Sequence, residues 1–169
     1  MKLQDLTVSK WLGTTDDFSL NDLQGRVVLV HAFQMLCPGC VLHGVPQAQK
    51  VFETFKQEKV AVLGLHTVFE HHEAMGEISL KAFLHEFRVK FPVGIDEPSK
   101  NSEIPKTMAH FQLQGTPSWL IFDQNGELRA NIFGQMQDLI LGAEISRLLY
   151  STDSEPSSIY KTPTERKQK

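Results

Sequence analysis

The sequence predicts an α/β domain in which a central mixed β-sheet carries helices on both faces. Three observations lead to this prediction. Residues 26–33 and 60–66 form apolar runs that are typical of central strands covered on both sides. A helical spacing of apolar residues lies between the two runs, so a right-handed parallel crossover is expected to join them. Further along, an Asn125-Gly126 turn between two more apolar runs indicates a β-hairpin.

The first part of the chain is predicted to lead into the first buried strand. Residues 1–24 are a mixed segment whose apolar side chains anchor it to the core, namely Leu3, Leu6, Val8 and Trp11. The strand at 26–33 follows. A helix is expected from Cys40 onwards, and Pro46 inside its pattern should kink it or end its first turn.

The middle of the chain alternates predicted strands and helices. The strand at 60–66 is followed by a polar, histidine-rich loop at 67–76. Residues 77–87 place apolar side chains at helical spacing. A short extended piece at 91–95 comes next, and then a short helix at 104–113, whose first turn suits a proline.

The last part of the domain is predicted to be a hairpin and a closing helix. The hairpin strands are residues 119–123 and 128–133, and the helix covers 136–150. Residues 151–169 are rich in Ser, Pro, Thr, Glu and Lys, and carry too little apolar surface to order themselves. We therefore expect one domain at 1–150 and a flexible tail after it.

Length, charge and composition exclude several classes of function. The 169 residues suit one domain with a sizeable core, and a net charge of -3 gives no reason to expect a nucleic-acid partner. No apolar run approaches the roughly 20 residues of a membrane span, and residues 1–7 lack the apolar core of a secretory signal. We therefore expect a cytoplasmic protein with no membrane association, in which cysteines are more often catalytic or metal-binding than structural.

Cys37 and Cys40 are the only cysteines, and they lie at the predicted junction between a strand and a helix. Only a thiolate attacks a disulfide, and the backbone N–H groups at a helix start favour that anion. We therefore assign Cys37 as the attacking thiol. Cys40, one turn further in, should be more buried and protonated, and should resolve the mixed disulfide that Cys37 forms.

Less reactive interpretations of these residues also exist. The cysteine pair could be half of a zinc site completed by histidines, or two inert core residues. A second group of polar side chains lies at and after the end of the second strand, and it could bind a metal ion or be solvated surface. Its members are His66, Glu70, His71, His72 and Glu73. We favour dithiol chemistry because of the strand-to-helix context, and we expect neither a metal nor a dissociable cofactor, since no nucleotide or flavin motif is present.

The combined motifs resemble the thioredoxin superfamily, in particular the TlpA-type thiol-disulfide reductases and the related peroxiredoxins, or redoxins. The resemblance covers roughly residues 15–150. It rests on Leu23-x-Gly25-x-Val27-Val28-Leu29-Val30, Phe33, Cys37-x-x-Cys40, Gly115-Thr116-Pro117 and Asn125-Gly126. It implies a thioredoxin-like fold, with Cys37 as nucleophile and Cys40 as resolving thiol. It also implies a cis Pro117 beside the disulfide, and a Thr116 backbone that pairs with an extended substrate.

Three positions depart from the family pattern. Leu36 stands where reductases of this type usually have Trp before the first cysteine. Pro46 lies six residues after Cys40 rather than five, which predicts a one-residue bulge in the helix. His31 stands where thioredoxins carry a buried acid. We assign His31 a role as acceptor of the Cys40 proton, the alternative being a core histidine bonded to backbone.

The sequence favours an oxidoreductase that reduces disulfides in proteins or small molecules, with electrons from a partner thiol protein or glutathione. The runner-up is a peroxiredoxin-like peroxidase in which Cys37 attacks a hydroperoxide. Peroxiredoxins usually have Thr or Ser where this chain has Gln34, and they need an arginine near the thiolate, for which Arg129 is the candidate.

A non-catalytic binding or metal-carrier module is the third interpretation. The copper-handling relatives place three residues between their cysteines, and this chain has two.

Overall fold

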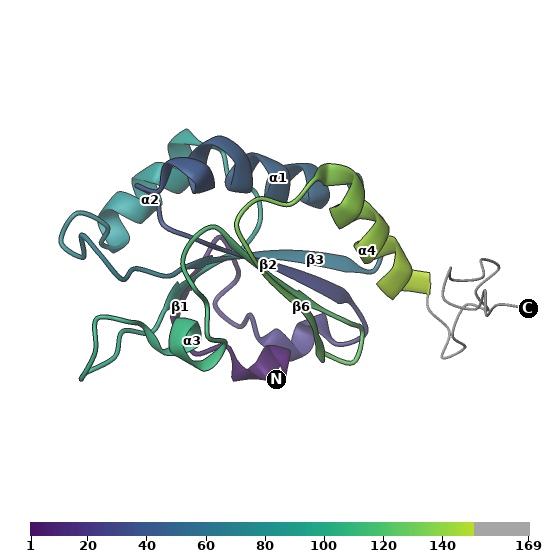
Figure 1. The fold of residues 1–169 in the computed structure, drawn as a ribbon, viewed down its shortest axis with the longest axis horizontal. Helices are drawn as coiled ribbons and strands as arrows, with labels where there is room; N and C mark the ends of the chain where they lie inside the picture. The colour runs from purple at the N-terminus through teal and green to yellow at the C-terminus, as the bar shows by residue number, and fades with distance from the viewer. Residues whose placement is uncertain (151–169) are drawn as a thin grey trace, which may run out of the picture.

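A computed structural model describes residues 1–150, and its centre is a six-stranded mixed sheet (Figure 1). The strands lie in the order β1-β4-β3-β2-β5-β6. β2, β3 and β4 run parallel to one another, and β1, β5 and β6 are antiparallel to their neighbours. The bounds are β1 (Val8–Leu12), β2 (Val27–Phe33), β3 (Val60–His66), β4 (Val93–Asp96), β5 (Ser118–Phe122) and β6 (Leu128–Phe133).

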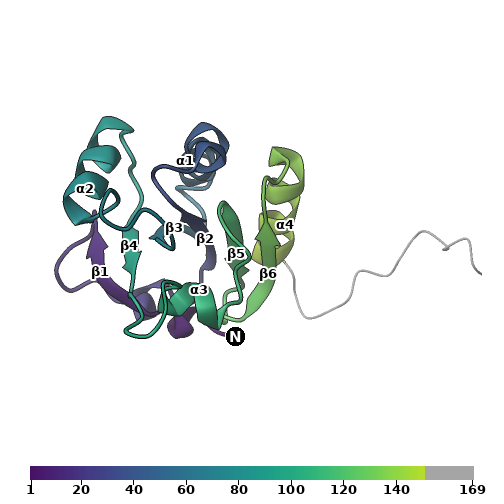
Figure 2. The same cartoon turned by 60° about the vertical axis from the view of Figure 1, so that its left-hand side comes forward.

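Helices cover both faces of this sheet, as Figure 2 shows. On one face lie α1 (Val45–Thr54), α2 (Glu77–Glu86) and α4 (Asp138–Tyr150), and on the other lies α3 (Lys106–His110). The second face is also covered by two short 3-10 turns, η1 (Leu3–Asp5) and η2 (Leu20–Leu23). Every residue of β2 and β5 is buried between these two layers. The predicted fold class is therefore confirmed.

The lead-in to the domain contains more structure than the sequence pattern indicated. Leu3 and Leu6 are buried in the core, as expected, but residues 8–12 also form the edge strand β1, antiparallel to β4. This strand is short and its middle residues are exposed. It therefore lacks the apolar run that identifies β2 and β3, because an edge strand buries only part of its surface.

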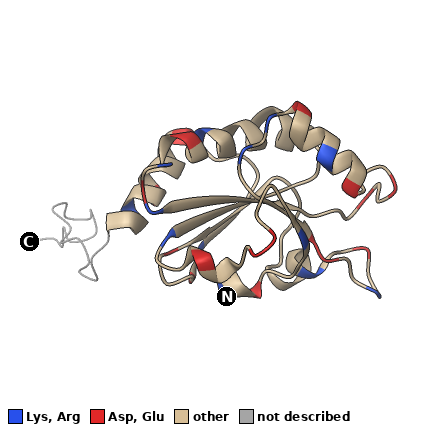
Figure 3. Cartoon of the chain, turned by 180° about the vertical axis from the view of Figure 1, so that it is seen from behind, with Lys and Arg blue, Asp and Glu red and all other residues tan. Residues whose placement is uncertain are grey.

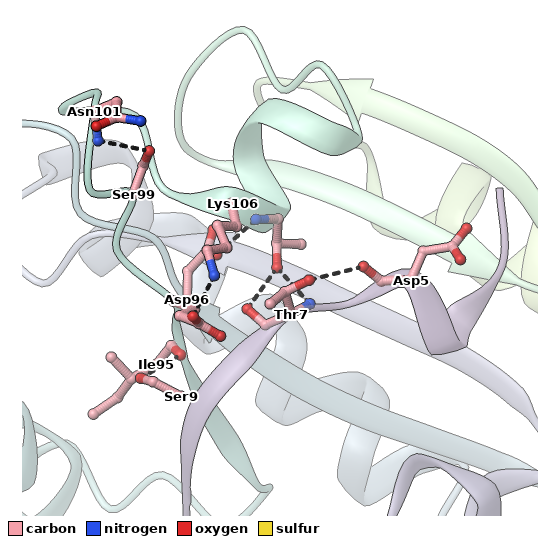
Figure 4. A network of polar contacts seen from close by, with 10 residues as sticks. Asp5, Thr7, Ser9, Ile95, Asp96, Ser99, Asn101 and Lys106 are labelled. Carbon is pink, nitrogen blue, oxygen red and sulfur yellow. Dashed lines mark hydrogen bonds and ion pairs between the residues drawn. The ribbon is translucent and has the colours of Figure 1, made fainter.

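A buried polar network fixes β1 and β4 to the start of α3 (Figure 4). Asp96 accepts hydrogen bonds from the Thr67 hydroxyl at 2.8 Å and from the backbone N–H groups of Thr107 and Met108 at 2.8 and 3.0 Å. The Thr107 hydroxyl accepts from the Thr7 N–H and donates to the Thr7 carbonyl. Burial raises the pKa of Asp96, against the opposing effect of these donors.

Basic and acidic residues are both spread over the helices and loops (Figure 3). Among residues 1–150, no helix has the length and apolar character that crossing a bilayer requires.

The predicted hairpin is confirmed as β5 and β6, and Asp123 caps its turn by accepting from the N–H groups of Asn125 and Glu127. The predicted tail at 151–169 lies outside the described residues.

Candidate active site

The two thiols lie next to each other just beyond the end of β2. The Cys40 thiol donates to Cys37 Sγ over 2.7 Å, and the backbone N–H of Cys40 donates to the same sulfur over 3.3 Å. The carbonyl of Cys37 accepts the N–H of Val41 at 3.0 Å, so the helical segment begins at Cys37. A sulfur in this position receives the donors that stabilise negative charge at a helix start.

The two sulfurs differ in exposure, and burial has a clear effect on the pKa of Cys40. Cys37 is half-buried, whereas Cys40 is fully buried. Burial, followed by the hydrogen bond to Cys37, raises the pKa of the Cys40 thiol to about 12. Cys40 is therefore a thiol that donates to its neighbour, and the expectation that it is the more buried of the pair is confirmed.

The Thr116-Pro117 peptide bond is cis and lies against the thiols, as the motif predicted. Cys37 Sγ is 3.5 Å from the carbonyl oxygen of Thr116, to which its thiol donates. Pro117 packs against Gly39, since a methyl group built on Gly39 would lie 3.5 Å from Pro117 Cδ. The structure thus brings Cys37, Cys40, Thr116 and Pro117 together at one point of the surface.

His31, on β2, is buried between aromatic side chains. Its imidazole stacks on Trp119 with 4.4 Å between ring centroids and on Phe33 with 5.5 Å. Neither ring nitrogen has a hydrogen-bond partner within residues 1–150, so the backbone-bonded alternative is wrong. Burial lowers the pKa of His31 to about 3, and the ring is therefore neutral at neutral pH. The assigned role as proton acceptor for Cys40 stays a prediction.

The helix that follows Cys40 begins with a wide turn. Residues Cys40–Gly44 form a π-helical turn, η3, and only then does the regular helix α1 start, with Pro46 in its first turn. The one-residue bulge predicted from the position of Pro46 is therefore confirmed. Gly44, the last residue of this turn, lies directly against His31: a methyl group on Gly44 would lie 2.2 Å from His31 Nε2.

Two further residues support the loop before Cys37, and sequence reasoning did not assign them these roles. Buried Gln34 accepts the N–H of Phe69 at 3.2 Å and donates to Glu70 at 3.3 Å. His66 accepts the N–H of Met35 at 3.4 Å, and burial lowers its pKa to about 4. The partners of Gln34 and Met35 lie more than thirty positions further along the chain, so no local pattern reveals them.

A groove of about 520 Å³ opens beside Pro117, between α1 and the segment before α4. Its lining combines apolar, amide and charged side chains, among them Leu42, Pro46, Gln47, Lys50, Met136 and Asp138. Exposed apolar side chains follow the rim of the dithiol, namely Leu36, Leu42 and Phe133, which are 57%, 68% and 54% exposed. These three side chains give the rim of the dithiol an apolar surface.

Two sequence-based alternatives lack the geometry that they require. Arg129 pairs with Asp123 at the turn of the β5–β6 hairpin, whereas Pro117 and the dithiol lie at the other end of that hairpin, so its assignment near the thiolate is wrong. Within the described part of the chain, no three His, Cys, Asp or Glu side chains gather closely enough to hold a metal ion.

Comparison with known proteins places this geometry among redox proteins. Residues 2–131 match the model of the AhpC/TSA family. A solved thioredoxin-like superfamily protein is 57% identical, covers 90% of this chain and 98% of its own, and superposes with a TM-score of 0.85. A solved thiol-disulfide isomerase from Corynebacterium glutamicum is 48% identical over 87% of this chain and 95% of its own, with a TM-score of 0.83.

Similarity to curated proteins is more distant. The thiol-disulfide oxidoreductase ResA of Bacillus cereus is 24% identical over 116 residues, which are 69% of this chain. The matched region is 60% of the length of that relative. The same share holds for ResA of Bacillus thuringiensis, at 27% identity.

Proposed function

The chain belongs to the AhpC/TSA family, and from this we propose that it is a thiol-disulfide oxidoreductase that reduces disulfides with Cys37 and Cys40. One observation carries the proposal. The half-buried Cys37 sulfur accepts two hydrogen bonds from buried Cys40, next to the carbonyl of Thr116 before a cis proline. Two relatives are named as a thiol-disulfide oxidoreductase and a thiol-disulfide isomerase, and this supports the same reaction.

The reaction begins with attack by Cys37. Its thiolate bonds to one sulfur of the substrate disulfide, and the other substrate sulfur leaves as a thiolate that takes a proton from water. Cys40 then loses its proton and attacks Cys37 Sγ, which breaks the mixed disulfide and releases the second substrate thiol. Two electrons have passed to the substrate, and Cys37 and Cys40 have become a disulfide.

Cys40 must shed its proton before it can attack, and its raised pKa opposes this step. We propose His31 as the group that receives the proton, because it lies on β2, the strand that leads to the dithiol; burial, which lowers the pKa of His31 to about 3, works against this transfer. The substrate chain is held extended beside Pro117, where the backbone N–H and carbonyl of Thr116 pair with it. Leu36, Leu42 and Phe133 contact its apolar side chains.

The oxidised protein returns to the dithiol by the reverse exchange. A partner dithiol protein, or two molecules of glutathione, supplies the electrons and is itself oxidised to the disulfide. Net reduction of substrates is the expected direction in the cytosol, which is the compartment that we propose. The substrates are proteins or small molecules that contain a disulfide.

The test compares two substrates for the same protein. The reduced full chain should reduce insulin-type disulfides in the presence of glutathione or a dithiol, and the Cys37→Ser variant should not. Hydroperoxide consumption is measured in parallel under identical conditions. If Cys37 consumes peroxide rapidly but leaves protein disulfides intact, the protein is a peroxidase and our proposal is wrong.

A further inference from the structure

One half of strand β3 has a neighbour on only one side. β2 pairs with β3 along the whole of Val60–His66, but β4 pairs only with the last three residues, Gly64 to His66. Within residues 1–150, the segment from Val60 to Leu63 therefore has a free edge, in addition to the outer edges of the terminal strands β1 and β6. Free edges are templates for pairing with another extended chain.

The backbone groups at this edge point away from β2. Gly64 N–H donates to the Pro92 carbonyl at 2.8 Å, so residue 64 faces β4. Alternate residues of a parallel strand face the same side, and Val62 and Val60 therefore direct their N–H and C=O groups toward the free edge. The ladder stops at this point because Pro92, which would donate next to Val62, has no N–H.

A groove of about 350 Å³ runs along this edge in the plane of the sheet. One wall is formed by Val51, Phe52 and Phe55, which pack with the core on the α1 side. The other wall is formed by Phe18 and Leu23, which pack with the core on the opposite side. Its floor is the β3 edge itself. The groove thus has the place and the surroundings of a missing strand segment.

The rim of the groove is basic. Arg26 and Lys56 line it, both are exposed, and neither forms an ion pair with another residue among positions 1–150. Asp22 also lines the groove, and its carboxylate accepts the N–H of Ser19 at 2.8 Å, so the lining carries two cations and one anion. Acidic groups of an occupant would therefore meet a net positive charge from these side chains.

We propose that this groove, which we name the β3-edge groove, binds an extended peptide of a partner protein as an additional strand. The occupant pairs its backbone with Val60 and Val62. It places apolar side chains against both walls, because both are apolar, and acidic residues near Arg26 and Lys56. Val60 pairs with Val27 at the start of β2, whereas the dithiol follows the end of β2. The groove and the dithiol are therefore separated by the length of one strand, about 20 Å. Binding there leaves Cys37 free to react.

The test uses the full chain and a fluorescein-labelled, end-blocked peptide with three central valines flanked by glutamates. Binding is followed by fluorescence anisotropy. Two N-methylated versions of the peptide are also tested. One carries backbone methyl groups on the odd-numbered residues and the other on the even-numbered residues, so each version lacks the N–H groups along one edge of the extended peptide. We expect one version to bind about tenfold more weakly or worse, while the other binds like the parent. Equal binding of both versions, or no binding of the parent, would overturn the proposal.

Two further measurements separate strand addition from simple insertion of a side chain. In the free protein, the Val62 amide should exchange with deuterium faster than the Leu63 amide. Bound peptide should slow the exchange of the Val62 amide and leave that of the Leu63 amide unchanged. A Val62 amide already protected without peptide would contradict a free edge. The Arg26→Glu/Lys56→Glu variant should bind the acidic peptide about tenfold more weakly and a lysine-flanked peptide more tightly.

The single variants Arg26→Glu and Lys56→Glu have a matched control in Lys100→Glu, an exposed reversal of one charge in a loop far along the chain from the groove. It should leave peptide binding unchanged. Reduction of insulin disulfides should also be unchanged in the groove variants, since they do not alter the dithiol. Equal loss of binding in Lys100→Glu and in the two single groove variants would show that only net charge matters, and would refute the assignment of the site.

Discussion

Replacing Gly44 by alanine tests how the wide turn after the dithiol is held in place. The added methyl group would lie 2.2 Å from His31 Nε2 and 2.6 Å from His31 Cε1, distances that real carbon atoms do not reach. The imidazole has no room to retreat, because it is stacked on Trp119 at 4.4 Å and on Phe33 at 5.5 Å. The backbone of the π-helical turn must therefore move.

The expected loss of stability follows from two opposing contributions. Overpacking of a well-packed core costs roughly 1–3 kcal/mol, and alanine gains up to about 1 kcal/mol over glycine in a helix. Since both Gly44 and His31 are buried and the clash is severe, we expect the Gly44→Ala variant to lose about 2 kcal/mol. Urea unfolding of the reduced full chain, followed by tryptophan fluorescence, measures this difference.

Gly142→Ala is the matched control, because it adds the same methyl group inside α4 with nothing within 4 Å of it. It should raise stability by up to about 1 kcal/mol. Combining Gly44→Ala with His31→Ala should cost clearly less than the two single changes added together, since the second change removes the clash. A Gly44→Ala variant as stable as Gly142→Ala would refute this account of the turn.

Further predictions concern the thiols, the buried histidines and the polar network. The Cys40→Ser variant should accumulate a mixed disulfide with substrate, visible by mass spectrometry, while its multiple-turnover activity falls by about two orders of magnitude. The folded-state pKa values of His31 and His66 lie below the unfolded value of 6.5, so stability should fall as pH drops from 6.5 towards 4. Each histidine contributes up to about 1.4 kcal/mol per pH unit, and urea unfolding of His31→Leu should show a shallower pH slope. The same variant should change the pH dependence of disulfide reduction, and an unchanged profile would remove the assigned role of His31. Asp96→Asn should lose about 1–3 kcal/mol in thermal or urea unfolding, because an amide cannot accept every hydrogen bond that the carboxylate does.

Much of the sheet could be predicted because its central strands are buried on both faces. Continuous apolar runs identify β2 and β3, and the Asn125-Gly126 turn identifies the β5–β6 hairpin. The edge strand β1 could not be predicted in the same way. It buries only part of its surface, and its pairing with β4 joins residues about 85 positions apart.

The geometry of the candidate site was predictable for residues that belong to local motifs. Cys37, Cys40 and the cis Pro117 follow from short stretches of sequence together with the family resemblance. The supporting contacts of Gln34 and Met35 were not predictable, because they depend on the parallel register that sets Phe33 of β2 opposite His66 of β3. Local sequence does not encode that register.

Two departures from the family pattern, which look unrelated in the sequence, are one feature in the structure. His31 replaces a smaller carboxyl group with an imidazole, and the extra residue before Pro46 widens the helix start into a π-helical turn. The last residue of that turn is Gly44, the position where a side chain would collide with the imidazole. A histidine beneath the dithiol therefore requires space that the wide turn and the missing Cβ supply together. It follows that restoring an acid at position 31 alone would leave an unfilled volume beside Gly44, and that deleting the extra residue alone would drive the helix into the ring.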